Sequence, residues 1–269
     1  MKHIALVLIL LIGTVQISKA QTGSIIITKN NNAGTITRQI DSSGYASIWN
    51  FTKTSTGWIS TINYTKLAPC PGTPTVYYAG QTYHTVQIGS QCWLVENLNV
   101  GTMIYGSQDQ TNNGVIEKYC YLDDPVNCTA YGGLYQWGEA VQYQNGASNT
   151  TSPNSAFIGN IQGICPGGWH IPTYNEFDTL AAAVNQDGND LWSIGQEAGT
   201  NTSGFSALLA GGRGSDGVFR GLGTSTYFWG STEDSEIGAC YFYLYGSGST
   251  ITLTYAGKVC GFSVRCVKD

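Results

Sequence analysis

Charged side chains are scarce in this chain of 269 residues. They make up 11% of it, and 12 Lys and Arg stand against 17 Asp and Glu, for a formal net charge of −5. Proteins that bind nucleic acid carry a basic patch or stripe for the phosphate backbone, and no such cluster is present here. The charge pattern therefore argues against a nucleic-acid partner.

Long hydrophobic runs are also missing. The longest, residues 4–12, is far short of the roughly 20 residues that a membrane-spanning helix needs. Lys2 precedes this run, and Ser18-Lys19-Ala20 follows it as a small-x-small cleavage site, which is typical of a signal peptide. We expect residues 1–20 to be removed, a mature chain from Gln21 without a lipid anchor, no membrane span, and a secreted or cell-surface location.

Histidine is nearly absent, which limits the possible chemistry. After residue 20 the chain has only His84 and His170, and neither lies in a hydrolase or zinc motif. Two oxygen-rich segments, 187–190 and 233–236, are interpreted as solvated loops and not as calcium sites. We therefore expect no catalytic residue, no metal and no cofactor.

Cysteine, in contrast, is plentiful. All eight cysteines follow the predicted signal peptide. An even number in an exported chain predicts four disulfide bonds, although the count alone leaves the pairing open.

Short β-branched runs separated by turn clusters fill residues 21–68, which predicts a small β-meander of about four strands. Pro69, Pro71 and Pro74 then indicate a stiff linker over residues 69–75 and a second domain from 76 to 269. The alternative is that residues 21–68 are simply the first strands of a single domain.

Helix signals are few beyond this linker. Thr173 and Glu176 are spaced as a capping box, and apolar residues follow at steps of three and four, which predicts a helix from about residue 174. Shorter helices are expected over 133–141 and near 190–198.

The C-terminal stretch has the alternation of strands. Cys240, Phe242 and Leu244 alternate with three tyrosines, and residues 251–255 alternate in the same way after a Gly-Ser turn. A last strand is expected over 261–267.

Four spaced motifs carry a resemblance to a known family. They are Gly89-Ser90-Gln91-Cys92-Trp93 with Glu96-Asn97-Leu98, Tyr131-Gly132-Gly133-Leu134-Tyr135-Gln136-Trp137, Cys165-Pro166-Gly167-Gly168-Trp169-His170-Ile171-Pro172, and Gly261-Phe262-Ser263-Val264-Arg265-Cys266-Val267. Together they resemble the Fibrobacter succinogenes major paralogous domain, a family of exported bacterial proteins. The resemblance covers residues 76–269 and leaves the N-terminal meander outside.

That family is similar to the C-type-lectin-like fold, which is shared with the formylglycine-generating enzymes and with retroelement-diversified proteins. The resemblance implies an α+β domain with two main helices and a twisted antiparallel sheet. In that fold a cysteine near a helix bridges to the last strand, which implies Cys165–Cys266. We interpret Cys120–Cys128 as a local pair, and Cys240–Cys260 and Cys70–Cys92 then remain by elimination.

An aromatic and polar surface near the C-terminus is the candidate ligand-binding site, because tyrosine and tryptophan offer apolar faces with polar rims to a sugar or a protein. Its expected residues are Tyr227, Trp229, Glu233, Asp234, Tyr241, Tyr243, Tyr245 and Thr252. The alternative is that this face packs under a loop, which would make the tyrosines part of the core.

The function predicted from the sequence is a binding or adhesion module that recognises a glycan or an extracellular protein. A second possibility is a structural subunit of an extracellular filament or surface layer that self-associates through its N-terminal strands. A third, an oxidase related to the formylglycine-generating enzymes, rests on the resemblance of folds, and we find no match to that enzyme's active-site context.

Overall fold

The computed structural model describes residues 68–269, apart from 194, 195, 197, 198 and 247, and gives the backbone of six strands before residue 68. The chain divides into two compact units, Met1–Lys66 and Leu67–Asp269. The predicted signal peptide lies outside the described residues except at β1 (Leu8–Ile9) and β2 (Thr14–Val15).

The first unit contains a four-stranded antiparallel sheet in consecutive order. Its strands are β3 (Ile25–Lys29), β4 (Ala33–Arg38), β5 (Tyr45–Thr54) and β6 (Gly57–Lys66). Each strand pairs with the next along the chain, which is the connectivity that a meander requires.

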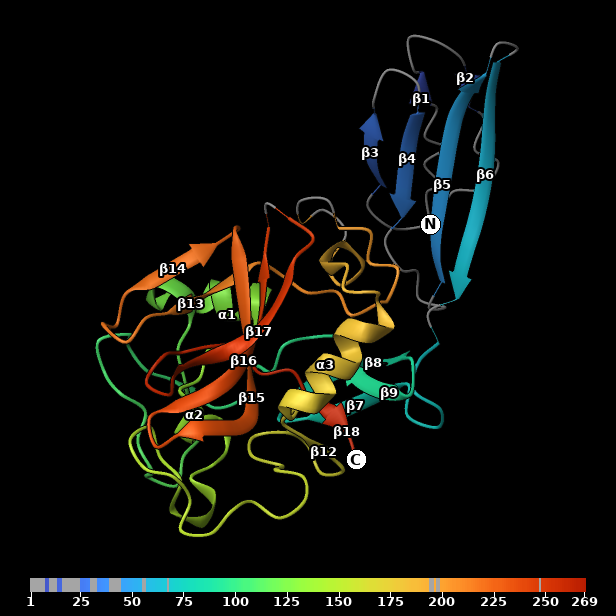
Figure 1. Ribbon diagram of the computed structural model, residues 1–269. Helices are drawn as coiled ribbons and strands as arrows, with labels where there is room; N and C mark the ends of the chain where they lie inside the picture. The colour runs from blue at the N-terminus through green and yellow to red at the C-terminus, as the bar shows by residue number, and fades with distance from the viewer. Residues whose placement is uncertain are drawn as a thin grey trace. The chain divides into compact units, whose positions relative to one another are not determined.

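Two five-stranded sheets form the framework of the second unit (Figure 1). The first has the order β12-β18-β9-β8-β7, with β7 at Thr75–Tyr78, β8 at Gln81–Ile88, β9 at Gln91–Leu94, β12 at Trp169–His170 and β18 at Val267–Lys268. The second has the order β14-β13-β15-β16-β17, with β13 at Ala210–Arg213, β14 at Phe219–Leu222, β15 at Ser225–Ser235, β16 at Gly238–Tyr245 and β17 at Ile251–Gly257.

The remaining elements of this unit are short. The helices are α1 (Pro125–Tyr131), α2 (Trp137–Ala140) and α3 (Tyr174–Ala183). Three 3-10 turns cover Tyr121–Asp123, Gln144–Gly146 and Gly188–Asp190, and β10 (Thr102–Met103) pairs with β11 (Glu117–Lys118).

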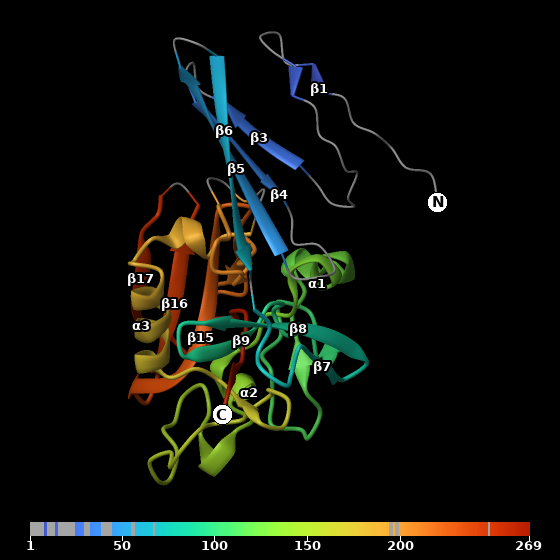
Figure 2. The same ribbon diagram turned by 90° about the vertical axis from the view of Figure 1, so that its right-hand side faces the viewer.

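Helix α3 begins as the sequence predicted. The Thr173 hydroxyl accepts from the Glu176 backbone N–H, and the Glu176 carboxylate accepts from the Thr173 backbone N–H. Its apolar side packs on the second sheet (Figure 2), where the rings of Phe177 and Phe242 stack with centroids 4.9 Å apart. The predicted alternation of β16 is also confirmed, since Cys240, Phe242 and Leu244 are fully buried on this side.

The predicted fold class was wrong. From residue 68 on, the described chain is mostly β, with twelve strands in three sheets and helices of only seven, four and ten residues, so it is not a two-helix α+β domain of C-type-lectin-like architecture. The helix expected over 133–141 is reduced to α2, because Gly132 at a φ of 85° and the extended Gln136 hold the preceding segment out of the helical region. Near 190–198 the described residues hold only the end of a 3-10 turn.

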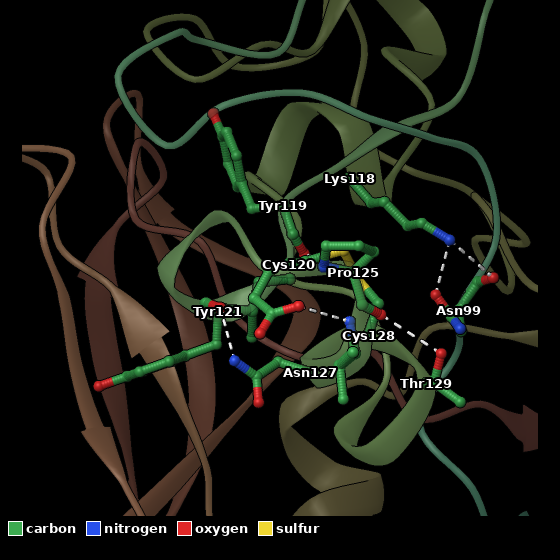
Figure 3. The surroundings of a disulfide bond; sticks show 12 residues. Asn99, Lys118, Tyr119, Cys120, Tyr121, Pro125, Asn127, Cys128 and Thr129 are labelled. Atoms are coloured by element: carbon green, nitrogen blue, oxygen red, sulfur yellow. Dashed lines mark hydrogen bonds between the residues drawn. A yellow bond between two sulfur atoms is a disulfide. The ribbon is translucent and has the colours of Figure 1, made fainter.

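Three disulfide bonds cross-link the second unit. They are the expected pairs Cys70–Cys92, Cys120–Cys128 and Cys165–Cys266. The second of these closes the short loop between β11 and α1 (Figure 3). There the Asp124 side chain caps α1 by accepting from the Val126 N–H.

The expected fourth disulfide, Cys240–Cys260, was wrong, because both residues are free thiols. Cys240 lies on the α3 side of the sheet, where its thiol is beside Thr232. Cys260 packs on the opposite side, near Tyr241. Successive residues of a strand face opposite sides of the sheet, so Cys240 and Tyr241 point in opposite directions. Cys260 lies on the side of Tyr241, and the sheet therefore separates it from Cys240.

Candidate functional site

Four tyrosines stand on the side of the second sheet that faces away from α3. Tyr227 lies on β15, directly opposite Tyr243 on β16, and Tyr241 and Tyr245 flank Tyr243 at two-residue steps along β16. The Tyr227 and Tyr243 rings stack with centroids 4.9 Å apart, and Tyr245 continues the stack 6.3 Å from Tyr243. We call Tyr227, Tyr241, Tyr243 and Tyr245 the tyrosine face.

Phe262 supports this face from below. Its ring lies 4.8 Å from Tyr227 and 5.3 Å from Tyr241, and it is only 7% exposed. On β13, Gly212 leaves the space that these rings occupy, since a Cβ there would lie 3.1 Å from both Tyr227 and Phe262. The tyrosines are therefore anchored at their base, which limits the side-chain entropy lost on binding a partner.

The outer part of the face is open to solvent. Tyr245 is 47% exposed, and the other three tyrosines are half-buried. Burial raises the pKa of Tyr243 to about 12, with the neighbouring Tyr227 adding to the shift, and burial also raises the pKa of Tyr241. These phenols are therefore neutral at pH 7 and can both donate and accept hydrogen bonds.

Two threonines extend the face onto the edge strand β17. Thr252 lies directly opposite Tyr243, and Thr254 lies opposite Tyr241. Residues opposite each other in an antiparallel pair point to the same side of the sheet, so both threonines share the side of the tyrosines. Thr252 was among the predicted site residues.

Three predicted site residues are not members of the tyrosine face. Trp229 lies on the same side of the sheet, opposite Tyr241 and with its ring centroid 4.4 Å from that of Phe262, but it is fully buried. Its indole N–H donates to the Tyr135 carbonyl oxygen at 2.8 Å, so it belongs to the core beneath the tyrosines. The Glu233 carboxylate accepts from the buried ammonium of Lys258. Asp234 is exposed near the β15–β16 turn and accepts from Ser235. The structure thus gathers Tyr227, Tyr241, Tyr243, Tyr245 and Thr252, buries Trp229 beside them, and separates Glu233 and Asp234 from them.

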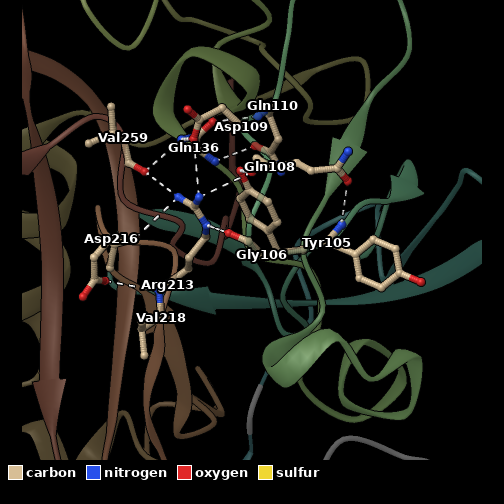
Figure 4. A network of polar contacts seen from close by, with 12 residues as sticks. Tyr105, Gly106, Gln108, Asp109, Gln110, Gln136, Arg213, Asp216, Val218 and Val259 are labelled. Carbon is tan, nitrogen blue, oxygen red and sulfur yellow. Dashed lines mark hydrogen bonds and ion pairs between the residues drawn. The ribbon is translucent and has the colours of Figure 1, made fainter.

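A buried arginine fixes the segment beside the tyrosine face, and no sequence pattern indicates it. Arg213, on β13, donates to the carbonyl oxygens of Gly106 at 2.7 Å and Val259 at 3.1 Å, and it pairs with Asp109 at 3.4 Å (Figure 4). Gln136 also donates to both Asp109 and Val259. Because Val259 lies just after β17, this network holds the C-terminal end of that strand in place.

Phe262 and Arg213 are the residues of this region that sequence reasoning missed. Phe262 was visible only as a member of the last family motif. Arg213 is an isolated charge in a glycine-rich stretch with no local pattern to mark it. The arrangement of the strands shows that Phe262 supports the tyrosines and that Arg213 holds the segment after β17 in place.

His170 lies at a different place, between two carboxylates. Its Nδ1 is 2.7 Å from Asp269 and its Nε2 is 2.9 Å from Glu176. Burial alone lowers the pKa of His170, but the hydrogen bonds and charges of Glu176 and Asp269 outweigh it, so this pKa is raised above 6.5. The charged imidazole ties the start of α3 to Asp269, next to β18.

The described residues include no cluster of three or more His, Cys, Asp or Glu side chains placed to hold a metal ion. In the same part of the chain, no helix has both the length and the apolar character needed to cross a bilayer.

The second unit is thus a β-rich, disulfide-bonded domain with a row of tyrosines of which Tyr245 is exposed and the other three are half-buried. Residues 86–268 match the sequence model of the Fibrobacter succinogenes major domain, and the chain belongs to that family. No curated protein and no solved structure matches the chain.

Proposed function

We propose that this protein is an exported binding module that holds a glycan or an extracellular protein on its tyrosine face. The proposal rests on one observation, the stacked row of Tyr227, Tyr241, Tyr243 and Tyr245, which Phe262 supports and which is open to solvent at Tyr245. Exposed tyrosines that are held rigidly provide large contact area at a low entropic cost, and their hydroxyl groups add directional hydrogen bonds.

The stacking of the rings affects what each tyrosine offers a ligand. Tyr227 and Tyr243 lie nearly parallel, at 22°, so each covers part of the other's face. Tyr245 is the most exposed of the four and stacks on Tyr243 at 27°. We expect Tyr245 to make the main apolar contact, with the edges and hydroxyls of Tyr241 and Tyr243 supplying polar contacts.

The test is a binding screen of the oxidised protein against an immobilised glycan array and a panel of extracellular proteins, with calcium and again with chelator. Any partner found is then titrated against Tyr243→Ala/Tyr245→Ala. We expect chelator-resistant binding that this double variant abolishes while the melting temperature changes little.

Tyr77 provides a matched control. It is 76% exposed on β7, in the other sheet, so Tyr77→Ala removes an exposed tyrosine away from the face. This variant should bind like the wild type. Equal affinity of wild type and Tyr243→Ala/Tyr245→Ala for every partner found would refute the site.

The proposal gives the protein no catalytic residue and no cofactor, and it places the protein outside the cell. Three disulfides support an oxidising compartment. The low charge of the chain and the neutral phenols of Tyr241 and Tyr243 both favour recognition of uncharged partners.

A further inference from the structure

Strand β17 forms an unprotected edge of the second sheet. It is the last strand in the order β14-β13-β15-β16-β17, and all its pairings within the described residues are with β16. Just before the strand, Asp187 forms an isolated antiparallel bridge with Thr250, and the Gly188 N–H donates to the Ser249 carbonyl oxygen at 2.6 Å. Beyond this point, no hydrogen bond within the described residues joins Thr252–Ala256 to any group outside β16. The outward-pointing N–H and C=O groups of this strand therefore lack protein partners and could pair with another strand.

The other edges of the second unit are less suited to pairing. Strands β7, β12 and β14 have four, two and four residues, and β14 also carries Arg220, in an ion pair with Asp216. Strand β17 has seven residues with no charge, no proline and an unbroken register with β16. Charges, prolines and bulges are the usual means of preventing edge pairing, and β17 has none of them.

We propose that β17 pairs with β17 of a second copy of this chain, in antiparallel fashion about a two-fold axis through Thr254. This register overlaps all seven residues. It places Thr254 opposite its own symmetry mate, Thr252 opposite Ala256, and Leu253 opposite Tyr255. The two sheets then join into one continuous sheet of ten strands.

The side chains of β17 favour pairing with β17 of a second copy. An identical strand brings no charge, so no like charges meet, and the two-fold axis keeps Thr254 on the same side in both copies. On the α3 side, Tyr255 is 41% exposed and Leu253 is half-buried, and pairing each with the other in the second copy covers both. Such aromatic and aliphatic cross-strand pairs stabilise sheets.

The pairing goes beyond the proposed function and does not depend on any ligand. A two-fold axis perpendicular to the sheet places both tyrosine faces on the same side of the joined sheet. A dimer would therefore present two binding surfaces in one direction, which increases avidity for a multivalent partner.

Sedimentation analysis of the full oxidised protein at increasing concentration tests the proposal. We expect a monomer–dimer equilibrium. Thr254→Lys and Thr254→Glu should each weaken it on the order of tenfold or more, because two like charges then face each other on the axis. An equimolar mixture of these two variants should dimerise again, and added salt should weaken that dimer.

Thr150→Lys is the matched control, since Thr150 is exposed on a loop and the variant has the same change of charge. It should dimerise like the wild type. At concentrations where the wild type is monomeric, all variants should keep the wild-type melting temperature. A wild type that stays monomeric, or a dimer that Thr254→Lys leaves intact, overturns the proposal. The second outcome would place self-association elsewhere, for example at the N-terminal strands.

Crosslinking tests the register directly. Opposed residues of an antiparallel pair have Cα atoms about 4.5–5.5 Å apart, which a disulfide can span. In a Cys240→Ser/Cys260→Ser background, Thr254→Cys should form a disulfide-linked dimer under mild oxidation. Thr252→Cys, placed opposite Ala256, should not, and the reverse result would overturn the register.

Discussion

The ammonium nitrogen of Lys258 lies 4.4 Å from the centre of the Trp137 ring and is fully buried. Its charge is balanced by the Glu233 carboxylate, and it also donates to the Glu236 carbonyl oxygen at 2.8 Å. Glu233 therefore neutralises a buried cation, which is why it does not serve the tyrosine face.

Removing this carboxylate should destabilise the fold. Glu233→Gln leaves the Lys258 ammonium buried without its counter-charge, and we expect a loss of about 3 kcal/mol in the free energy of unfolding. Urea denaturation measures it. Glu233→Leu/Lys258→Met removes both charges and should cost less than Glu233→Gln; a greater cost would contradict a charge-balancing role for Glu233.

The three disulfides should differ in their contribution to stability. Cys165–Cys266 spans 101 residues and Cys120–Cys128 spans 8. Loop-closure entropy predicts losses of about 4.5 and 2.5 kcal/mol when each pair is replaced by alanine. Denaturant unfolding of the two double variants tests this order. Equal losses of unfolding free energy in the two variants would mean that native contacts, and not loop length, determine how much each disulfide contributes.

The two free cysteines provide a direct chemical test. Burial raises the pKa of Cys240 to about 11 and also raises that of Cys260, so both thiols should react slowly in the folded protein, Cys240 most slowly. A thiol-specific reagent should detect two thiols per chain after denaturation without reductant, and none in Cys240→Ser/Cys260→Ser. No thiols in the denatured wild type would show that a fourth disulfide exists.

His170 should make stability depend on pH in a specific direction. Its folded-state pKa is raised above 6.5, so its charged form stabilises the fold below that pH, and this stabilisation is lost as the pH rises through the raised value. The pKa of Glu176 is lowered below 4.5, with His170 and Thr173 outweighing the effect of burial, so its contribution is lost as the pH falls through that lower value.

The stabilisation from this pair is therefore greatest between about 4.5 and 6.5. Melting temperatures of the wild type and His170→Gln, measured across pH, should differ most in that window and converge at alkaline pH. A difference that grows with rising pH would contradict the charged state of His170.

Arg213 should tolerate no replacement, because it uses several donors at once. Lysine keeps the charge but cannot reach Gly106, Val259 and Asp109 together from one nitrogen. We expect Arg213→Lys to lose about 2 kcal/mol of stability, since buried carbonyl oxygens are left without donors. Arg220→Lys, at an exposed ion pair, is the matched control and should change little.

Local patterns in the sequence predicted several parts of this structure. The capping box of Thr173 and Glu176 located the start of α3, and the alternation around Cys240 defined both sides of β16. These features depend on residues a few positions apart, so they can be recognised without the fold. The fold class could not be recognised in this way, because the short glycine-interrupted segments carry too little periodicity to indicate how strands are ordered.

The sequence by itself determined the family, the low charge, the helix at residue 174 and which residues of β16 share a side of the sheet. The tertiary structure alone decided that Tyr227 joins the tyrosines of β16, that Glu233 turns away to Lys258, and that Cys240 and Cys260 stay apart. The physical reason is that strand pairing and sheet sides are set by contacts between segments distant in sequence, whereas caps and alternation are set by neighbours along the chain.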